Sequence, residues 1–363
     1  MESKANKNRI CFLISSISQA GGTGRVCAII SNKLAQLGYD VTVVSFFGEH
    51  SYFALEHTVK TQMLFQRRYP FKLILPYVVI KLRSVIKKAK PDFLINVDTA
   101  LFPYSYYSSL GLKFKNIAWE HFNFNVTLNA GIRVYGRKLA AKYAACVITL
   151  TEKDKQNWLQ NLHCQAPVVA VSNPSPFGVE EIDFSRKQKI VIAVGRLTHQ
   201  KGFDRLIQIW NSVLTSVPDG WELHIVGSGE LEGALKSQIK SFNLTSSVHI
   251  IPANNHIQTN YDTASIYCMT SNYEGFPMVL LEAQNFGLPL ISFDVETGPA
   301  EIIKDNGFLI KDGDNNAFAD ALLELIKNEE KRIEMGQKSL KYADNYLVDN
   351  VIKHWIKLFN HLN

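Results

Sequence analysis

The chain alternates between short apolar segments and amphipathic segments. Residues 9–15 are apolar, a glycine-rich turn at 21–24 follows, and apolar residues then recur at helical spacing over 26–37. Gly38 is a suitable residue to end that helix, and a second apolar segment covers residues 41–47. Short apolar segments that alternate with amphipathic helices indicate parallel strands covered by helices on both faces. The sequence therefore predicts an α/β fold.

The second half of the chain repeats the alternation. A first strand is expected at 190–194, followed by a polar loop that ends at Gly202 and by a helix with apolar residues over 206–214. Further strands are expected at 94–97 and 116–119 in the first half, and at 223–226, 248–251, 265–269 and 290–293 in the second. Two doubly wound, Rossmann-like domains that face a central cleft are the architecture this repetition predicts.

A linker is expected between the two halves. Pro174, Pro176 and Gly178 lie close together and precede a charged stretch, which is typical of an interdomain segment. With 363 residues, the chain is long enough for two separate cores. We place the first domain at 1–172, the linker at 173–188 and the second domain at 189–345, and we expect a C-terminal helix at about 346–363 to pack back onto the first domain.

Charge is distributed unevenly between the halves. Residues 1–175 contain 22 Lys and Arg against 9 Asp and Glu, whereas residues 176–363 contain 17 against 24. A basic half attracts polyanions or an anionic membrane surface. No apolar run approaches the roughly 20 residues that span a bilayer, and the five cysteines form no C-x-x-C pair. We therefore expect a cytoplasmic protein without a disulfide scaffold or a metal site.

Two carboxylates frame a segment that begins Gly275-Phe276-Pro277. Because proline suits the first turn of a helix, Glu274 is expected in the loop before that helix and Glu282 about two turns inside it. Backbone N–H groups at the start of the helix would be free donors, namely those of Phe276, Met278 and Val279. Carboxylates beside free N–H groups suit a ligand with hydroxyls and negative charge, such as a nucleotide sugar. The alternative is an ordinary amphipathic helix.

Two cations and several glycines follow predicted strands. Arg196 and Lys201 lie in the loop after the 190–194 strand, where two positive charges could clamp a diphosphate. Gly227 follows the 223–226 strand and would allow close approach of the backbone to a ligand. Gly21 and Gly22 precede a helix N-terminus, which favours an anion, although the full G-x-G-x-x-G spacing is lacking. Solvated basic residues and a plain tight turn are the competing interpretations.

Three further features carry weaker signals. His121 follows the 116–119 strand and could bind a substrate hydroxyl or be structural, and Asp98 has a similar position. Asp312-Gly313-Asp314 has D-x-D spacing, but its surroundings predict a surface turn and a helix cap. Residues 67–90 mix bases with apolar residues, which favours either peripheral contact with an anionic membrane or a crossover helix with a solvated face. No nucleic-acid-binding motif accompanies this charge.

Together these segments resemble the retaining glycosyltransferases of GT-B architecture, the family-4 or group 1 type that includes bacterial enzymes of surface-polysaccharide and lipid-linked oligosaccharide assembly. The resemblance covers most of the second half and is thinner in the first, where it rests on Gly21-Gly22 and His121. The matching segments are Gly195-Arg196-Leu197, Lys201-Gly202-Phe203-Asp204, Val226 to Leu231, Ser271 to Ala283, Gly287 to Ile291, Thr297 to Ile303 and Asn306 to Ile310.

The resemblance implies roles for individual residues. Arg196 and Lys201 would hold the donor diphosphate, and Glu282 would accept hydrogen bonds from the ribose. The donor sugar would contact Glu274 and the backbone of Gly275, Phe276, Pro277 and Met278, with Val279 beside them. His121 would face the reacting carbon of the sugar. Gly21 and Gly22 would approach the phosphates. Ile251-Pro252-Ala253 departs from the family's usual glycine near the base-binding loop, which leaves the base less defined.

The reaction implied is transfer of a hexosyl or N-acetylhexosaminyl group from a nucleoside-diphosphate sugar, UDP above all, to a glycan acceptor, with retention and without a metal or cofactor. The family's basic first domain usually serves a lipid-linked acceptor, which agrees with the charge of residues 1–175 and with a place on the inner face of the plasma membrane. A nucleotide-sugar epimerase or NAD-dependent oxidoreductase would explain the glycine turns but not Glu274 and Glu282. A carbohydrate-binding subunit without turnover is the third possibility.

Overall fold

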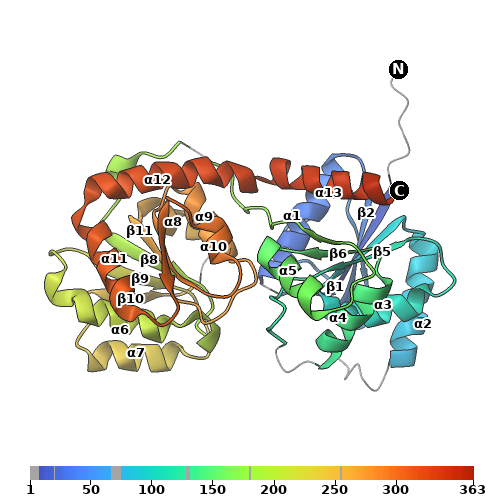
Figure 1. Ribbon diagram of the computed structural model, residues 1–363, viewed down its shortest axis with the longest axis horizontal. Coiled ribbons are helices and arrows are strands. Elements are labelled where there is room, and N and C mark those ends of the chain that lie inside the picture. The colour runs from blue at the N-terminus through green and yellow to red at the C-terminus, as the bar shows by residue number, and fades with distance from the viewer. Residues whose placement is uncertain (1–7, 20, 67–74, 128–130, 180, 254–255) are drawn as a thin grey trace. The chain divides into compact units, whose positions relative to one another are not determined.

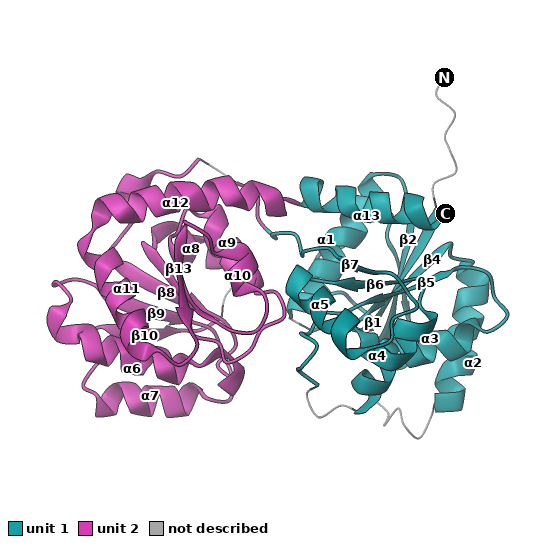
Figure 2. Ribbon diagram, viewed as in Figure 1, with its two compact units in different colours: residues 1–176, 348–363 teal, residues 177–347 magenta. Residues whose placement is uncertain are grey.

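The structure is a computed structural model that divides into two compact units (Figures 1 and 2). Unit 1 comprises residues 1–176 and 348–363, and unit 2 comprises residues 177–347. The residues described are 8–363 except 20, 67–74, 128–130, 180 and 254–255. The first part of the basic segment expected at 67–90 therefore lies outside the described residues. No helix in the described part is long and apolar enough to cross a membrane.

Unit 1 contains a parallel sheet with the strand order β3-β2-β1-β4-β5-β6-β7. Helices cover both of its faces (Figure 1), and their apolar stripes are buried against the sheet. Its strands are β1 Arg9–Ser16, β2 Asp40–Phe47, β3 Lys60–Met63, β4 Phe93–Val97, β5 Lys115–Trp119, β6 Cys146–Thr149 and β7 Val168–Ala170. Its helices are α1 Gly22–Gln36, α2 Leu75–Ala89, α3 Phe102–Ser109, α4 Gly131–Tyr143, α5 Glu152–Asn161 and α13 Val348–Leu362.

The C-terminal helix α13 completes the core of unit 1. Its Trp355 ring lies 4.7 Å from that of Trp119 and 6.4 Å from that of Phe12, and its Phe359 ring lies 4.7 Å from that of Phe93. Because all of these side chains are buried, α13 covers apolar strand residues that would otherwise face water. The chain thus returns to unit 1 after completing unit 2.

Unit 2 contains a second parallel sheet, with the order β10-β9-β8-β11-β12-β13. Its core includes Trp210 and Phe318, both fully buried. The strands are β8 Ile190–Val194, β9 Glu222–Val226, β10 Val248–Ile251, β11 Ile266–Met269, β12 Leu290–Asp294 and β13 Gly307–Lys311. The helices are α6 Phe203–Val213, α7 Glu232–Ser241, α8 Ile257–Thr263, α9 Met278–Asn285, α10 Pro299–Ile302, α11 Asn315–Lys327 and α12 Glu329–Ala343.

Each sheet has a topological switch point. In unit 1 the strand order reverses between β1 and β4, and in unit 2 it reverses between β8 and β11. The connections from two such strands leave in opposite directions, which opens a crevice at their carboxyl ends where ligands of open α/β sheets bind. The expected strands and the two doubly wound sheets are confirmed.

Candidate functional site

The switch point of unit 2 brings Lys201 and Glu274 together. Lys201 ends the short 3-10 turn His199–Lys201 after β8, and Glu274 lies in the loop between β11 and α9. Their Nζ and Oε1 atoms are 2.6 Å apart, and the side chains are only 15% and 8% exposed. An ammonium group has three donors, so this ion pair leaves Lys201 further donors for a ligand. The sequence gives no sign of this pair, because the two residues are 73 positions apart.

Glycines let the loops of this crevice touch through their backbones. Gly202 has a φ of +59°, and a Cβ there would lie 2.2 Å from the carbonyl oxygen of Thr270. A Cβ on Gly227 would lie 1.9 Å from the carbonyl oxygen of Gly195. A Cβ on Gly195 would in turn lie 3.0 to 3.1 Å from side-chain carbons of Lys201. Gly227 is therefore required by packing between the loops, whereas Gly195 leaves room for the stem of Lys201.

Arg196 differs from Lys201 in its surroundings. Its side chain is exposed, and the described part of the chain offers it no hydrogen-bonding or ionic partner. The backbone around it is fixed, because the N–H of Leu197 donates to the carbonyl of Ser228 at 3.0 Å and that of Gly195 to Val226 at 3.1 Å. An uncompensated guanidinium on a fixed loop is suited to a phosphate group.

The start of α9 departs slightly from the expected arrangement. Pro277 occupies the N-cap position and Met278 is the first helical residue, so Glu282 lies just over one turn inside the helix rather than about two. The N–H groups of Met278 and Val279 have no acceptor among the described residues, as expected for the first turn of a helix. Gly298, with a φ of +100°, packs against residues 275–277 and fixes the entry to the helix.

Glu282 is buried and receives a hydrogen bond from the hydroxyl of Tyr261, with 2.8 Å between the oxygens. Burial, followed by the nearby Glu282 carboxylate, raises the pKa of Tyr267 well above its usual value. Phe276 is buried, and its ring lies 5.8 Å from that of Tyr346, so its side chain anchors the loop and only its backbone is left to face a ligand. The Tyr261 hydroxyl thus holds the Glu282 carboxylate in place.

The D-x-D segment forms the predicted surface turn and helix cap. Asp314 caps α11 by accepting a hydrogen bond from the N–H of Ala317 at 3.0 Å. Asp312 pairs with Arg205 at 2.9 Å, and Gly313 has the positive φ that such a turn favours.

In unit 1, His121 follows β5 and stacks beside Trp119, with 4.4 Å between the ring centroids. Its Nε2 is buried and has no hydrogen-bond partner in the part of the chain that the structure describes. Burial lowers the pKa of His121 to about 4, against the opposing effect of Glu120. The imidazole is therefore neutral near pH 7, and one of its nitrogens is available to a ligand. Gly21 and Gly22 belong to the same unit, and a Cβ on either would meet no atom within 4 Å.

A buried ion-pair network supports His121, and most of its residues were not among those predicted from the sequence. Glu120, fully buried, binds the Arg137 guanidinium at 2.7 Å and the Thr99 hydroxyl at 2.6 Å. Its other oxygen accepts the N–H of His121 at 3.0 Å. Burial raises the pKa of Glu120, but the Arg137 guanidinium outweighs this and holds that pKa below its usual range. The backbone position of His121 is thereby tied to the carboxylate.

Asp98 belongs to the same network. It binds Arg133 at 2.7 Å, and burial, followed by the Glu120 charge, raises the pKa of Asp98. Its φ of +102° is unusual for a residue with a side chain and shows that the surrounding contacts hold it in place. The spacing of Arg133 and Arg137, four residues apart, could have indicated two guanidinium groups on one face of a helix.

The low pKa of His121 makes unit 1 sensitive to acid. A folded-state pKa of about 4 lies below the ordinary 6.5, so the unfolded chain binds the proton more readily between these values. The difference between the two pKa values contributes about 3 kcal/mol to the free energy of unfolding above about pH 6.5. This contribution is lost as the pH falls towards 4. We expect urea unfolding of His121→Gln to lose less stability between pH 7 and 4.5 than the wild type. The exposed control His354→Gln should match the wild type, and equal slopes for all three would contradict the assignment.

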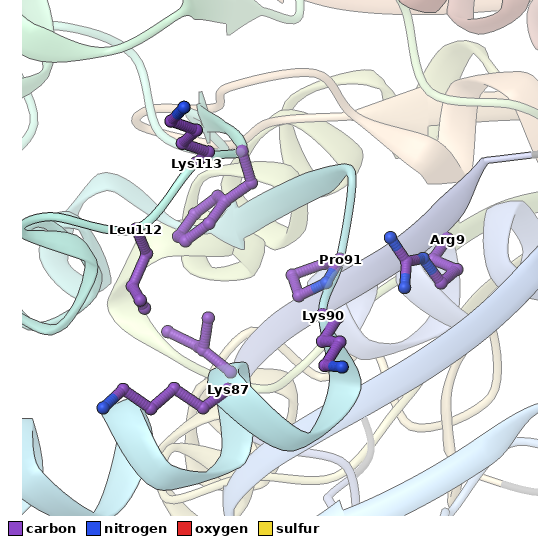
Figure 3. A pocket seen from close by; sticks show the side chains of 8 residues that line it. Arg9, Lys87, Lys90, Pro91, Leu112 and Lys113 are labelled. Carbon is purple, nitrogen blue, oxygen red and sulfur yellow. The ribbon is translucent and has the colours of Figure 1, made fainter.

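A pocket in unit 1 lies away from these residues. It has a volume of about 300 Å³ and is formed at the amino ends of β1, β4 and β5, the edge opposite to His121. Arg9, Lys87, Lys90 and Lys113 contribute positive charge to its lining (Figure 3).

Known proteins resemble the chain over nearly its whole length. The family model Glycosyl transferases group 1 matches residues 178–342, and Glycosyltransferase Family 4 matches residues 20–174. An uncharacterized glycosyltransferase of Haemophilus influenzae is 34% identical over 96% of this chain and 98% of its own length. The amylovoran biosynthesis glycosyltransferase AmsD of Erwinia amylovora is 34% identical over 97% and 99%.

Solved structures give the same fold. A mutant of S. aureus TarM, in complex with fondaparinux, alpha-GlcNAc-glycerol and UDP, superposes with a TM-score of 0.83 at 15% identity, covering 97% of this chain and 100% of its own. Anabaena HepE, in complex with UDP and glucose, gives 0.77 at 17% identity, covering 97% and 99%. The two doubly wound sheets are thus those of the GT-B fold, and the chain belongs to the family-4, group 1 glycosyltransferases.

Proposed function

We propose that the chain transfers a hexosyl or N-acetylhexosaminyl group, with retention, from a UDP-sugar to a glycan acceptor in bacterial surface-polysaccharide biosynthesis. The observation that carries this proposal is the Lys201–Glu274 ion pair at the switch point of unit 2, beside the free N–H groups of α9. A cation and a helix N-terminus suit a diphosphate, and a carboxylate suits sugar hydroxyls. TarM and HepE were solved in complex with UDP, and AmsD is named for amylovoran biosynthesis, which supports the choice of donor and pathway.

Each group of the donor would bind to residues of unit 2. Arg196 and Lys201 would bind the diphosphate, and the Glu282 carboxylate would accept hydrogen bonds from the ribose. Glu274 and the backbone of residues 275–279 would contact the transferred sugar. The ion pair with Lys201 would orient Glu274 before the sugar binds, so the site needs little rearrangement.

Catalysis would depend on stabilising the departing diphosphate. As the glycosidic bond breaks, negative charge grows on the phosphate oxygens, and Arg196, Lys201 and the α9 N–H groups would stabilise it without a metal ion. The retained configuration would follow from attack of the acceptor on the same face, with the leaving phosphate taking its proton. The names of several relatives specify α-linkages, among them a Campylobacter jejuni α-1,4-N-acetylgalactosaminyltransferase, which is 26% identical.

The acceptor is proposed to be lipid-linked and reached by peripheral contact of unit 1 with an anionic membrane. The C. jejuni relative is named for an undecaprenol-diphosphate glycan. On α2, Tyr77 and Ile80 are 55% and 68% exposed, and Lys87 and Lys88 are exposed at its end beside the basic pocket of Figure 3. Exposed apolar and basic side chains on one helix suit a membrane interface.

The membrane contact can be measured by sedimentation with anionic vesicles. The double variant Lys87→Gln/Lys88→Gln should bind less than the wild type, since each basic residue near such a surface contributes about 1 kcal/mol. The control Lys236→Gln/Lys240→Gln, on exposed positions of unit 2, should bind as the wild type does. Equal sedimentation of all three proteins would remove the proposed role of α2.

Turnover against a panel of nucleotide sugars tests the proposed function. A UDP-sugar should raise the unfolding temperature of the wild type, because a ligand that binds the native state stabilises it. The same sugar should be transferred to an acceptor glycan with an α-linkage, as read from the anomeric coupling in NMR. Binding without transfer would favour a carbohydrate-binding subunit, and a response to NAD instead would favour an oxidoreductase or epimerase.

A further inference from the structure

Three metal-ligating side chains meet on the sheet of unit 2, away from the proposed donor site. His224 on β9 and His249 on the neighbouring strand β10 are directly paired in the parallel register. Glu222 lies two residues before His224, so its side chain points to the same face of the sheet. The residues of opposite orientation, Leu223, Ile225 and Val248, are buried in the core. The side chains of Glu222, His224 and His249 therefore share the face of the sheet opposite to these apolar residues.

The ligand atoms lie at distances that a single ion can bridge. The Oε2 atom of Glu222 is 2.8 Å from Nε2 of His224 and 3.4 Å from Nε2 of His249, and each of the three residues offers a ligand atom within 4.8 Å of the others. Tetrahedral Zn²⁺ holds nitrogen and oxygen ligands at about 2.0–2.2 Å, which separates neighbouring ligand atoms by roughly 3.4 Å. Small side-chain rotations would bring the cluster to that geometry.

We propose that Glu222, His224 and His249 form a zinc site, with water as the fourth ligand. Two imidazole groups favour zinc over magnesium or calcium, which prefer oxygen ligands. The site is reachable from solvent, since the side chains of His224, His249 and Glu222 are 18%, 39% and 43% exposed. These ligands come from two neighbouring strands, so they show neither the C-x-x-C nor the D-x-D spacing on which the expectation of no metal site rested.

The bound ion would be structural rather than catalytic. Glu222 begins β9, at the end of the strand opposite to Gly227, whereas the proposed donor loops follow the carboxyl ends of their strands. Strand β10 is the edge of the sheet, where backbone groups lack a neighbouring strand on one side. A metal ion that binds side chains of β9 and β10 would tie this edge strand to the sheet and so stabilise it.

The buried cysteines do not compete for the ion. Burial raises the pKa of the Cys11, Cys27 and Cys146 thiols to about 12 and raises that of Cys268 further. Because a thiol binds zinc as the thiolate, these side chains are poor ligands at neutral pH. These four buried thiols therefore do not account for zinc bound by the native chain.

Zinc titration of the full chain, stripped with a chelator and monitored by a chromogenic zinc indicator, tests the site. The wild type and the exposed control His354→Ala should each bind one zinc ion per chain, with the same affinity. His249→Ala and Glu222→Gln should each weaken binding at least tenfold. Both variants should still be stabilised by the same nucleotide sugar as the wild type, which shows that unit 2 is folded.

Cobalt provides a second readout, because tetrahedral Co²⁺ has a characteristic visible absorption that the wild type should show and His224→Ala should lack. The proposal is overturned if the wild type binds no stoichiometric zinc, or if zinc binding to His249→Ala and Glu222→Gln equals that of the wild type.

Discussion

Replacing Lys201 with methionine should lower kcat by about 10²- to 10³-fold, the effect of removing one group that stabilises transition-state charge. Methionine keeps an unbranched stem in the space that Gly195 provides, so the loop should keep its packing. The substitution removes the ammonium group that would bind the departing diphosphate, and it leaves the buried carboxylate of Glu274 without this cation. Both consequences should raise the free energy of the transition state.

The measurement is steady-state turnover with the donor that the nucleotide-sugar panel identifies. Lys236→Met is a matched control, since Lys236 is an exposed lysine of unit 2 that pairs with Glu232 on the same helix. The double variant Lys201→Met/Glu274→Gln should lose less than the sum of the two single effects, because the residues interact directly. A Lys201→Met enzyme with the kcat of the control would show that Lys201 has no part in the reaction.

Replacing Arg137 with methionine should destabilise unit 1 by about 3–5 kcal/mol, the usual cost of removing one partner of a buried ion pair. The substitution leaves Glu120 fully buried without its guanidinium, and it also removes donors to the carbonyls of Asn123 and Val126. The polypeptide after β5, which includes His121, would lose the contacts that position it. We expect local opening there before any change in unit 2.

Hydrogen exchange followed by mass spectrometry distinguishes the two units. Peptides from β4 and β5 should exchange faster in Arg137→Met than in the wild type, and peptides from unit 2 should be unchanged. Lys138→Met provides the control, because Lys138 is adjacent in sequence but exposed. If the β5 peptides exchange at the same rate in Arg137→Met and Lys138→Met, the ion pair makes no net contribution to the stability of unit 1.

The strands and helices could be predicted from the sequence because their signals are local. The apolar segment at residues 190–194 and the glycine at position 38 depend only on neighbouring residues, and both have the expected structure. Pro277 shows the limit of such signals, since it caps α9 instead of starting it, and Glu282 lies just over one turn inside the helix rather than about two. A local preference for the first helical turn does not distinguish these two positions.

Contacts between distant residues could not be predicted in the same way. Lys201 and Glu274 are 73 residues apart, and only the order of the strands brings their loops to one switch point. Glu120 was passed over in favour of the adjacent His121, because its partner Arg137 lies on a helix whose packing the sequence does not specify. The paired histidines of β9 and β10 likewise depend on strand register.

A crystal structure of the protein with UDP tests the central claim most directly. We expect the diphosphate to contact Arg196 and Lys201, the ribose hydroxyls to donate hydrogen bonds to Glu282, and the uridine to bind to unit 2. A diphosphate bound elsewhere, for example in the basic pocket of unit 1 beside Arg9 and Lys87, with Arg196 and Lys201 making no contact to it, would contradict the account.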